Sequence, residues 1–174
     1  MEAIYYSVLF ILAGLLLRLS LIDIQSRRLP NPLVLAVAIL GLLLVFATCL
    51  HTKSFAPLLS AILGILFSAG PALLVSLIFW ALRGEEGFGA GDIKLLAALG
   101  LFVGPAGIAI LPAACLFACF YMSLIFITKF GRNPIKVITG KIPKKARKQT
   151  IAFGPYISVA TLIILLMPLL AALL

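Results

Sequence analysis

Two of the five acidic residues in this sequence could do chemistry as a pair. Asp23 follows a long apolar run and Asp92 precedes another, whereas Glu2, Glu85 and Glu86 lie in terminal or polar positions. A carboxylate at the edge of an apolar segment is costly, and such a residue is a functional candidate for that reason. Two carboxylates that lie close together can share one proton, because their repulsion favours a state with one charge. Such a pair can activate a water molecule for attack on an amide and protonate the leaving amine.

Each aspartate also has a structural explanation that the sequence leaves open. Asp92 precedes an apolar run and can be the N-cap of the next helix, a role worth about 1 kcal/mol. Asp23 stands where a helix ends, and the helix dipole disfavours a negative charge there. The basic residues Arg27 and Arg28 follow it and could form an ion pair with it at the surface.

The composition indicates what kind of elements position these two residues. Hydrophobic residues make up 64% of the 174 residues and charged residues 11%, whereas soluble domains are about 25% charged. The mean hydropathy is +1.27. Apolar runs of about 20 residues recur along the chain, which predicts an all-α, polytopic helical membrane protein. We expect one integral-membrane domain over residues 1–174, with the first apolar span retained because no basic region or cleavage site accompanies it.

About six transmembrane helices fit the apolar pattern. Four of them follow directly from the apolar runs: Ile4–Ile22, Leu33–Leu50, Phe55–Leu82 and Tyr156–Leu173. The third of these carries a predicted kink at Pro71. The segment 93–128 is expected to cross twice, with breaks at Gly104-Pro105 and at Pro112, so at least one of its crossings must be short or irregular.

The positive charges predict the orientation of these spans. Lys53 falls on one side, whereas Arg83, Lys94 and eight basic residues between 129 and 148 fall on the other if the spans alternate. The basic side is expected to be cytoplasmic. Asp23 ends the first span and Asp92 begins the fourth, so both are expected to face the cytoplasm at similar depth.

The net charge of +9 is expected to contact anionic membrane lipids rather than nucleic acid, because the basic residues cluster between apolar spans. Other chemistries lack the residues they need. His51 is the one histidine and there is no C-x-x-C pair, so no metal site and no cofactor are expected. A small transporter or channel that uses Asp23 and Asp92 as proton or cation ligands stays open as an alternative. Such proteins usually place ionisable residues near the bilayer midplane and often contain repeats, neither of which we find here.

Three motifs resemble those of the type IV prepilin peptidases, which are GxGD-class membrane aspartic proteases. GAGDIK at 89–94 is similar to the GxGDxK motif of that family. DIQSRRLPNPL at 23–33 resembles the other motif, in which an aspartate and a short polar loop precede a Pro-Asn pair, here Pro30 and Asn31. AFGPYI at 152–157 is similar to the Phe-Gly-Pro that begins the last span of the family. Residues alone give Phe-Gly-Pro no role beyond breaking the chain before that span.

The resemblance implies a membrane aspartic endopeptidase that removes the leader peptide of prepilin-like proteins at the cytoplasmic face. Asp23 and Asp92 match the catalytic pair, and helix dipoles lead us to expect Asp92 as the resting base and Asp23 as the acid. Gly89 and Gly91 match the motif glycines, which would let the backbone approach a substrate strand. Lys94 matches the motif lysine.

Further expectations concern the substrate. Glu85 and Glu86 are expected to attract its basic leader by electrostatic steering. The long members of the family carry a cysteine tetrad and an N-methyltransferase activity, and no tetrad occurs here. The resemblance is therefore to the short form found in Flp (tight-adherence) pilus systems, which implies a Flp-type substrate and cleavage without methylation, at the inner membrane.

Overall fold

The computed structural model describes residues 2–26, 29–84, 88–130 and 152–173, and these residues are helical with short connections. No strand occurs among them. The elements in chain order are α1 (Glu2–Ser26), α2 (Asn31–Thr52), α3 (Ala56–Arg83), α4 (Ala90–Val103), the 3-10 helix η1 (Gly104–Ala109), α5 (Ile110–Phe130) and α7 (Gly154–Leu173).

The lengths and surfaces of these helices are those of a polytopic membrane protein. Within the described residues, four segments are long and apolar enough to cross a bilayer: Ile4–Ser26, Asn31–Thr52, Ala56–Arg83 and Ala90–Ile125. A shorter apolar segment lies at Gly154–Met167. Large apolar side chains cover the outer faces of the helices, and Phe10 and Phe55 are more than 80% exposed. Such surfaces are compatible with lipid rather than with water.

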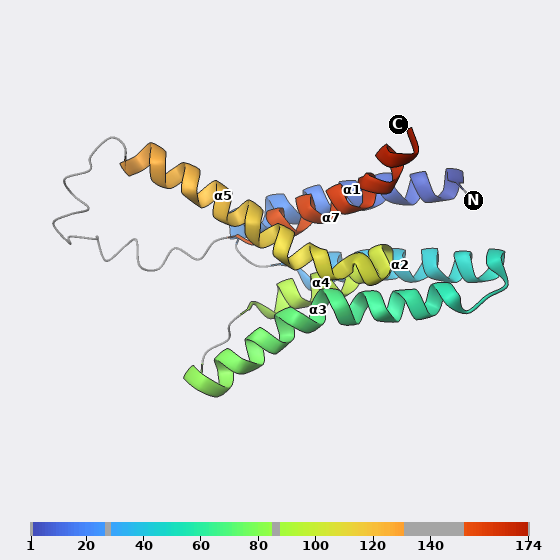
Figure 1. Cartoon of the computed structure of the whole chain (residues 1–174), viewed down its shortest axis with the longest axis horizontal. Coiled ribbons are helices and arrows are strands. Elements are labelled where there is room, and N and C mark those ends of the chain that lie inside the picture. The colour runs from blue at the N-terminus through green and yellow to red at the C-terminus, as the bar shows by residue number, and fades with distance from the viewer. Residues whose placement is uncertain (1, 27–28, 85–87, 131–151, 174) are drawn as a thin grey trace.

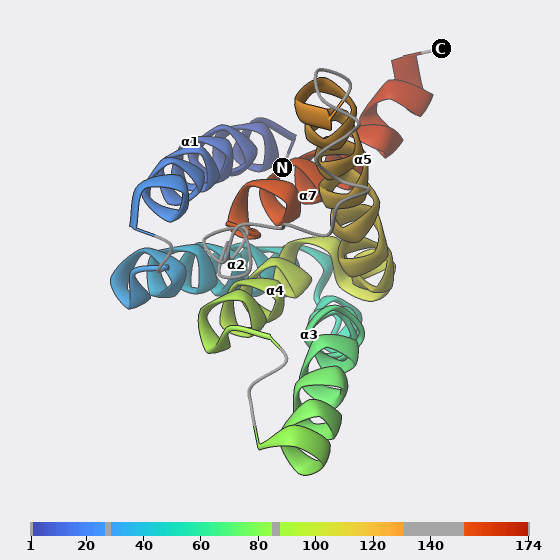
Figure 2. The ribbon, with the colours of Figure 1, turned by 90° about the vertical axis from the view of Figure 1, so that its left-hand side faces the viewer.

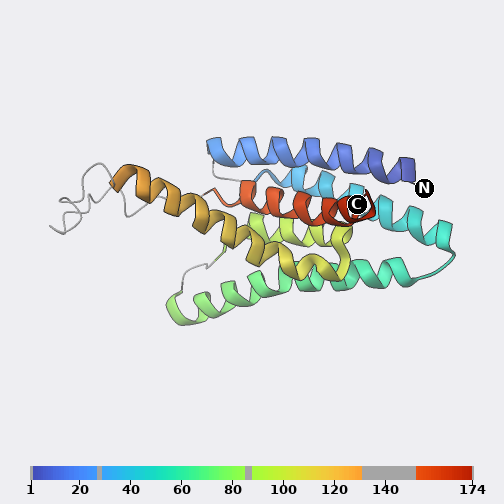
Figure 3. The same ribbon diagram turned by 45° about the horizontal axis from the view of Figure 1, so that its top comes forward.

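The segment after residue 90 turns back on itself, and two crossings of the membrane by it stay a prediction. Figure 3 shows α4 and α5 running in opposite directions, joined by η1. Gly104 begins η1 with a φ of 61°, a conformation that favours glycine. The 14 residues of α4 span about 21 Å, short of the roughly 30 Å hydrocarbon core.

The sequence also predicts disturbed helices at Pro71 and at Pro112, and the outcomes at these two prolines differ. Figure 1 shows that α3 changes direction partway along its length, and Pro71 lies inside this helix. The predicted break at Pro112 is wrong, because α5 continues through it. Pro112 is the third residue of α5, and the first turn of a helix tolerates proline because its N–H groups have no partner within the helix.

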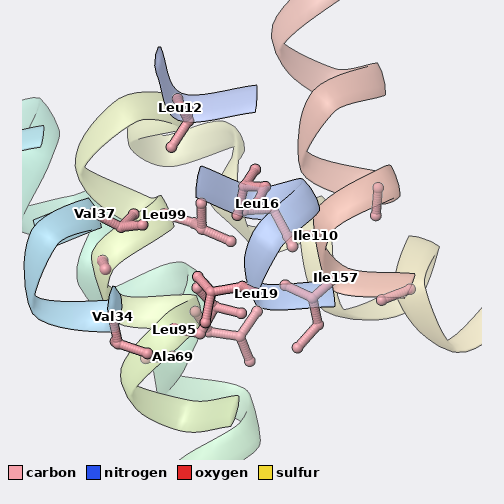
Figure 4. Close-up of a cluster of buried hydrophobic side chains, with 14 of the residues drawn as sticks. Leu12, Leu16, Leu19, Val34, Val37, Ala69, Leu95, Leu99, Ile110 and Ile157 are labelled. Atoms are coloured by element: carbon pink, nitrogen blue, oxygen red, sulfur yellow. The ribbon is translucent and has the colours of Figure 1, made fainter. Parts of the chain in front are cut away.

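Helix α4 occupies the centre of the bundle. Seen end-on in Figure 2, α4 lies among α2, α3, α5 and α7. Its buried leucines meet a stripe of α1 formed by Leu12, Leu16 and Leu19, and Figure 4 shows Leu95 and Leu99 within this core. The shortest α-helix is therefore packed among the longer ones, and its buried residues lie beyond the first turn that carries Asp92.

The contact of α4 with α3 depends on small residues. A Cβ atom built on Gly64 would collide with the backbone carbonyl oxygen of Gly100, so glycine lets the two helices approach this closely. The buried Ser68 hydroxyl donates a hydrogen bond of 2.8 Å to the Leu96 carbonyl oxygen. Small residues and interhelical hydrogen bonds are the usual means of packing helices in membranes, where neighbouring lipid is as apolar as leucine.

One end of the bundle gathers the segments that carry the sequence motifs. In Figure 1, α1 ends where α2, α4 and α7 begin, at the end opposite the N-terminus. Because the helices alternate in direction, residues far apart in the sequence meet there.

Candidate active site

Asp23 and Asp92 line a single cavity of about 340 Å³ at this end of the bundle. The other residues that line it are Leu29, Asn31, Gly89, Ala90, Gly91 and Lys94. The two aspartates lie close enough for the charge of one to act on the other. The structure thus brings together two acidic residues that neither helical spacing nor sequence proximity could place side by side.

Asp23 lies in the last turn of α1 and is 5% exposed. Its Oδ2 atom accepts a hydrogen bond of 2.9 Å from the backbone N–H of Gly154, the first residue of α7. A buried carboxylate needs such a partner, because burial without a hydrogen bond is costly. The suggested partners Arg27 and Arg28 lie outside the described residues.

Asp92 is the third residue of α4 and is not its N-cap. The N-cap is Gly89, whose carbonyl oxygen accepts the N–H groups of Asp92 at 3.0 Å and Ile93 at 3.2 Å. No side chain caps this helix. The N-cap explanation of Asp92 is therefore wrong, and its carboxylate is directed to the first turn of α4 and to the cavity.

The two motif glycines occupy close contacts within the protein. A Cβ atom on Gly91 would lie 3.1 Å from the Cβ atom of Leu29, in the connection that leads into α2. A Cβ atom on Gly89 would lie 3.3 Å from Oδ2 of Asp92. Gly91 thus lets α4 begin against the α1–α2 connection. Approach of a substrate strand to these glycines stays a prediction.

Pro30 and Asn31 begin α2 at the edge of the same cavity. Pro30 is the N-cap, and its carbonyl oxygen accepts the N–H groups of Leu33 and Val34 at 3.1 and 3.3 Å. Asn31 is exposed and lines the cavity. Three helices, α2, α4 and α7, therefore begin beside the two aspartates, and the positive ends of their dipoles offset part of the repulsion between two carboxylates.

An aromatic pair that the sequence analysis did not single out joins two sides of the site. The rings of Phe88 and Phe153 meet edge to face, with centroids 5.8 Å apart. Phe88 directly precedes Gly89, and Phe153 directly precedes Gly154. The segment before Asp92 is thereby packed against the segment that donates to Asp23. Each phenylalanine borders a motif glycine, which is the one signal that could have found the pair.

Some of the remaining site candidates line the cavity, and others lie outside the described residues. Lys94 is exposed and lines both the cavity with the aspartates and a neighbouring apolar cavity of about 490 Å³ between α2, α3 and α4. Asn31 also lines both. Glu85 and Glu86 lie outside the described residues.

The part of the chain that the structure describes contains no set of side chains that could bind a metal ion. No group of three or more histidine, cysteine, aspartate or glutamate residues gathers there. What the cavity does offer is two interacting carboxylates beside three helix N-termini, an arrangement suited to moving protons to and from a bound water molecule.

Comparison with known proteins finds one matching family and several relatives. A model of the type IV leader peptidase family matches residues 10–127. A prepilin leader peptidase/N-methyltransferase from Neisseria gonorrhoeae is 31% identical over 154 residues, which cover 88% of this chain and 46% of that protein. A protein of the same name from Pseudomonas aeruginosa is 34% identical over 151 residues, covering 87% of this chain and 46% of that protein.

Another protein of that name, from Burkholderia pseudomallei, is 41% identical over 98 residues, which are 55% of this chain and 29% of that protein. The matches to the Neisseria gonorrhoeae and Pseudomonas aeruginosa proteins cover most of this chain. This chain spans about half the length of each of these relatives. No solved structure matches it.

Proposed function

This chain belongs to the type IV leader peptidase family, and we propose that it is a membrane aspartic endopeptidase that removes the leader peptide of prepilin-like proteins. The relatives named above are leader peptidases of prepilins, and the proposal extends that activity to this chain. The chemistry is hydrolysis of one peptide bond by Asp23 and Asp92, with no metal ion or covalent nucleophile.

The observation that carries the proposal is the shared cavity of Asp23 and Asp92. The two residues come from helices that are not neighbours in sequence, and yet both border one space large enough for a peptide segment and a water molecule. A structural role for each aspartate separately would not require them to interact. A proton or cation site in a transporter would be expected near the middle of the bundle, whereas this cavity is lined by the last turn of α1 and the first turns of α2 and α4.

In the proposed reaction the ionised member of the pair removes a proton from water as the water oxygen attacks the peptide carbonyl carbon. The protonated member donates its proton to the amide nitrogen, and the carbon–nitrogen bond then breaks. The products are a new carboxyl group and a free amine. The two aspartates act as one titrating unit.

The dipoles that favoured Asp92 as the base are not the only ones near the two aspartates. The expectation considered only the helix that carries each residue, whereas Asp23 also faces the N-terminus of α7. Both carboxylates therefore lie near a positive helix end. We assign the acid and base roles to the pair and to neither residue alone.

The substrate is proposed to present its leader at the cytoplasmic face, as the distribution of basic residues predicts. A prepilin of the Flp type carries a basic leader, then a glycine, then an apolar segment that remains in the membrane. Such a substrate would bring its scissile bond to the end of the bundle where the cavity lies.

A cleavage assay tests the proposal. The full chain is expressed with a candidate prepilin, and loss of the leader is followed by gel and mass spectrometry for the wild type, Asp23→Asn and Asp92→Asn. Asparagine keeps the shape of the side chain and cannot act as the acid or base, so each variant should lose cleavage by about 10³-fold or more. The mass of the mature N-terminus also shows whether methylation accompanies cleavage.

Both variants must remain in the membrane at wild-type amounts for the result to count. Efficient cleavage by either variant would overturn the aspartate pair. Failure of the wild type on several prepilins of different types would overturn the substrate assignment and favour a transporter.

A further inference from the structure

We infer that Gly154 is a positioning residue for Asp23, through both its backbone N–H and its lack of a side chain. The inference rests on the proposed function, because it concerns how one of the two proposed catalytic carboxylates is held. It gives a role to the Phe-Gly-Pro motif, for which residues alone suggested only a break in the chain.

The backbone N–H groups at the start of α7 need partners outside the helix. The first four N–H groups of a helix have no partner within the helix. Here Pro155 has no N–H, and the N–H groups of Tyr156 and Ile157 reach the carbonyl oxygen of Phe153 at 3.1 and 3.2 Å. The N–H of Gly154 donates to Asp23 instead. The carboxylate thus satisfies one N–H group at the start of a helix that lies 131 residues away in sequence.

The contact between Gly154 and Asp23 leaves no room for a side chain at position 154. A Cβ atom on Gly154 would lie 2.8 Å from Oδ2 of Asp23 and 3.3 Å from its Cβ and Cγ atoms. The distance of 2.8 Å is shorter than Cβ atoms adopt in proteins. An alanine at 154 must therefore displace either the carboxylate or the start of α7. Gly154 is buried, which leaves little room for such a shift. Only glycine allows the N–H of this position to reach the carboxylate directly.

A second contact between α1 and α7 sets the register of the two helices, and so the positions at which Asp23 and Gly154 meet. The Ser20 hydroxyl lies 3.1 Å from the Ser158 hydroxyl, and Ser158 donates to the Gly154 carbonyl oxygen at 2.9 Å. Ser20 lies one turn before Asp23 on α1, and Ser158 lies one turn after Gly154 on α7. The two helices are therefore joined by two successive polar contacts, and sliding one along the other would break both.

These contacts matter for catalysis because proton transfer depends on the position of the carboxylate. A displacement of about 1 Å can lower turnover about 100-fold. Gly154 does not border the cavity that holds the two aspartates, so a substitution there should change turnover without changing substrate affinity.

The test compares Gly154→Ala with Gly14→Ala in the cleavage assay, at several substrate concentrations. Gly14 lies on α1, as Asp23 does, and a Cβ atom there meets nothing within 4 Å. We expect Gly154→Ala to lower kcat by about 10- to 100-fold with KM within about twofold of wild type. Gly14→Ala should behave as the wild type. Equal kcat values for the two variants would overturn the inference.

A double-mutant cycle on stability tests the same contact without relying on activity. The midpoint of thermal unfolding in detergent is measured for Gly154→Ala, Asp23→Ala and the double variant. We expect Gly154→Ala to lower the midpoint in the wild type and to be tolerated when Asp23→Ala has removed the carboxylate, so that the two changes are not additive. Additive effects would overturn the inference, since the residues would then act independently.

The two experiments separate failure of the inference from failure of the proposed function. If the wild type cleaves no prepilin, the proposed function fails, and the stability cycle still decides whether residue 154 holds Asp23. If the wild type cleaves and Gly154→Ala raises KM while kcat stays at the wild-type value, Gly154 belongs to substrate binding and the positioning role is wrong.

Discussion

The ring of Phe88 meets the ring of Phe153 edge to face, and this contact joins the two backbone segments that lead to the catalytic candidates. Phe88 stands before the first turn of α4, which carries Asp92. Phe153 stands before the first residue of α7, which donates to Asp23. The aromatic pair therefore links the first turn of α4 to the residue that donates to Asp23.

Replacing either ring should loosen the site. An edge-to-face pair contributes about 0.5–1.5 kcal/mol beyond the area it buries. We expect Phe88→Leu and Phe153→Leu each to lower the thermal midpoint and the cleavage rate, and the double variant to lose less than the sum of the two. Phe10→Leu is the matched control, because Phe10 is 83% exposed on α1. Additive losses would show that the rings act separately.

The packing of α4 against α3 predicts an unusual response to alanine. In the interior of a helix, glycine to alanine usually stabilises by about 1 kcal/mol. At Gly64 the new Cβ atom would collide with the Gly100 carbonyl, so Gly64→Ala should instead destabilise by about 1–3 kcal/mol. Gly14→Ala on α1, where a Cβ atom meets nothing within 4 Å, should be neutral or stabilising. Thermal unfolding of the purified protein in detergent measures the difference, and equal effects would contradict this account of the interface.

Ser68 tests the same interface through its hydrogen bond. Ser68→Ala removes the donor to the Leu96 carbonyl oxygen and should cost about 0.5–2 kcal/mol of stability. Ser54→Ala is the control for loss of an exposed hydrogen bond, because the Ser54 hydroxyl accepts a bond of 3.2 Å from the Ala56 N–H. A wild-type unfolding midpoint for Ser68→Ala would show that the bond adds nothing to the stability of α4.

The predicted orientation can be measured by labelling single cysteines. With Cys49, Cys115 and Cys119 replaced by alanine, Lys53→Cys and Arg83→Cys place one thiol at each end of α3. In intact cells a reagent that does not cross the inner membrane should label position 53 and leave position 83 unlabelled. The reverse pattern would place the cavity of Asp23 and Asp92 on the outer face and exclude cleavage in the cytoplasm.

The two glutamates before the motif glycines predict a salt-dependent effect. Exposed charges attract a basic leader over a distance but add at most about 1 kcal/mol each to binding. Replacing Glu85 and Glu86 by glutamine should raise the KM for a prepilin at low ionic strength and have little effect at high salt, with kcat unchanged. Unchanged kinetics at low salt would remove these residues from the substrate path.

Several features of this protein follow from the sequence alone. Long apolar runs must form helices in a membrane, because no other open structure satisfies its backbone hydrogen bonds there. The Gly104-Pro105 pair predicted a break in the segment 93–128. The chain does reverse there, between α4 and α5, with a positive φ at Gly104. The alternation of spans placed Asp23 and Asp92 at one end without any knowledge of their contacts.

The arrangement around the aspartates depended on the tertiary structure. In a soluble helix the apolar stripe marks the buried face, but here lipid and core are equally apolar, so the pattern of leucines could not show that α4 is the central helix. Pro112 looked like a break because its position within a helix was unknown. Contacts between distant residues, such as Gly154 with Asp23, Phe88 with Phe153 and Gly64 with Gly100, leave no periodic trace in the chain. The sequence thus determined which residues can do chemistry and at which end they lie, whereas helix packing decided what holds them there.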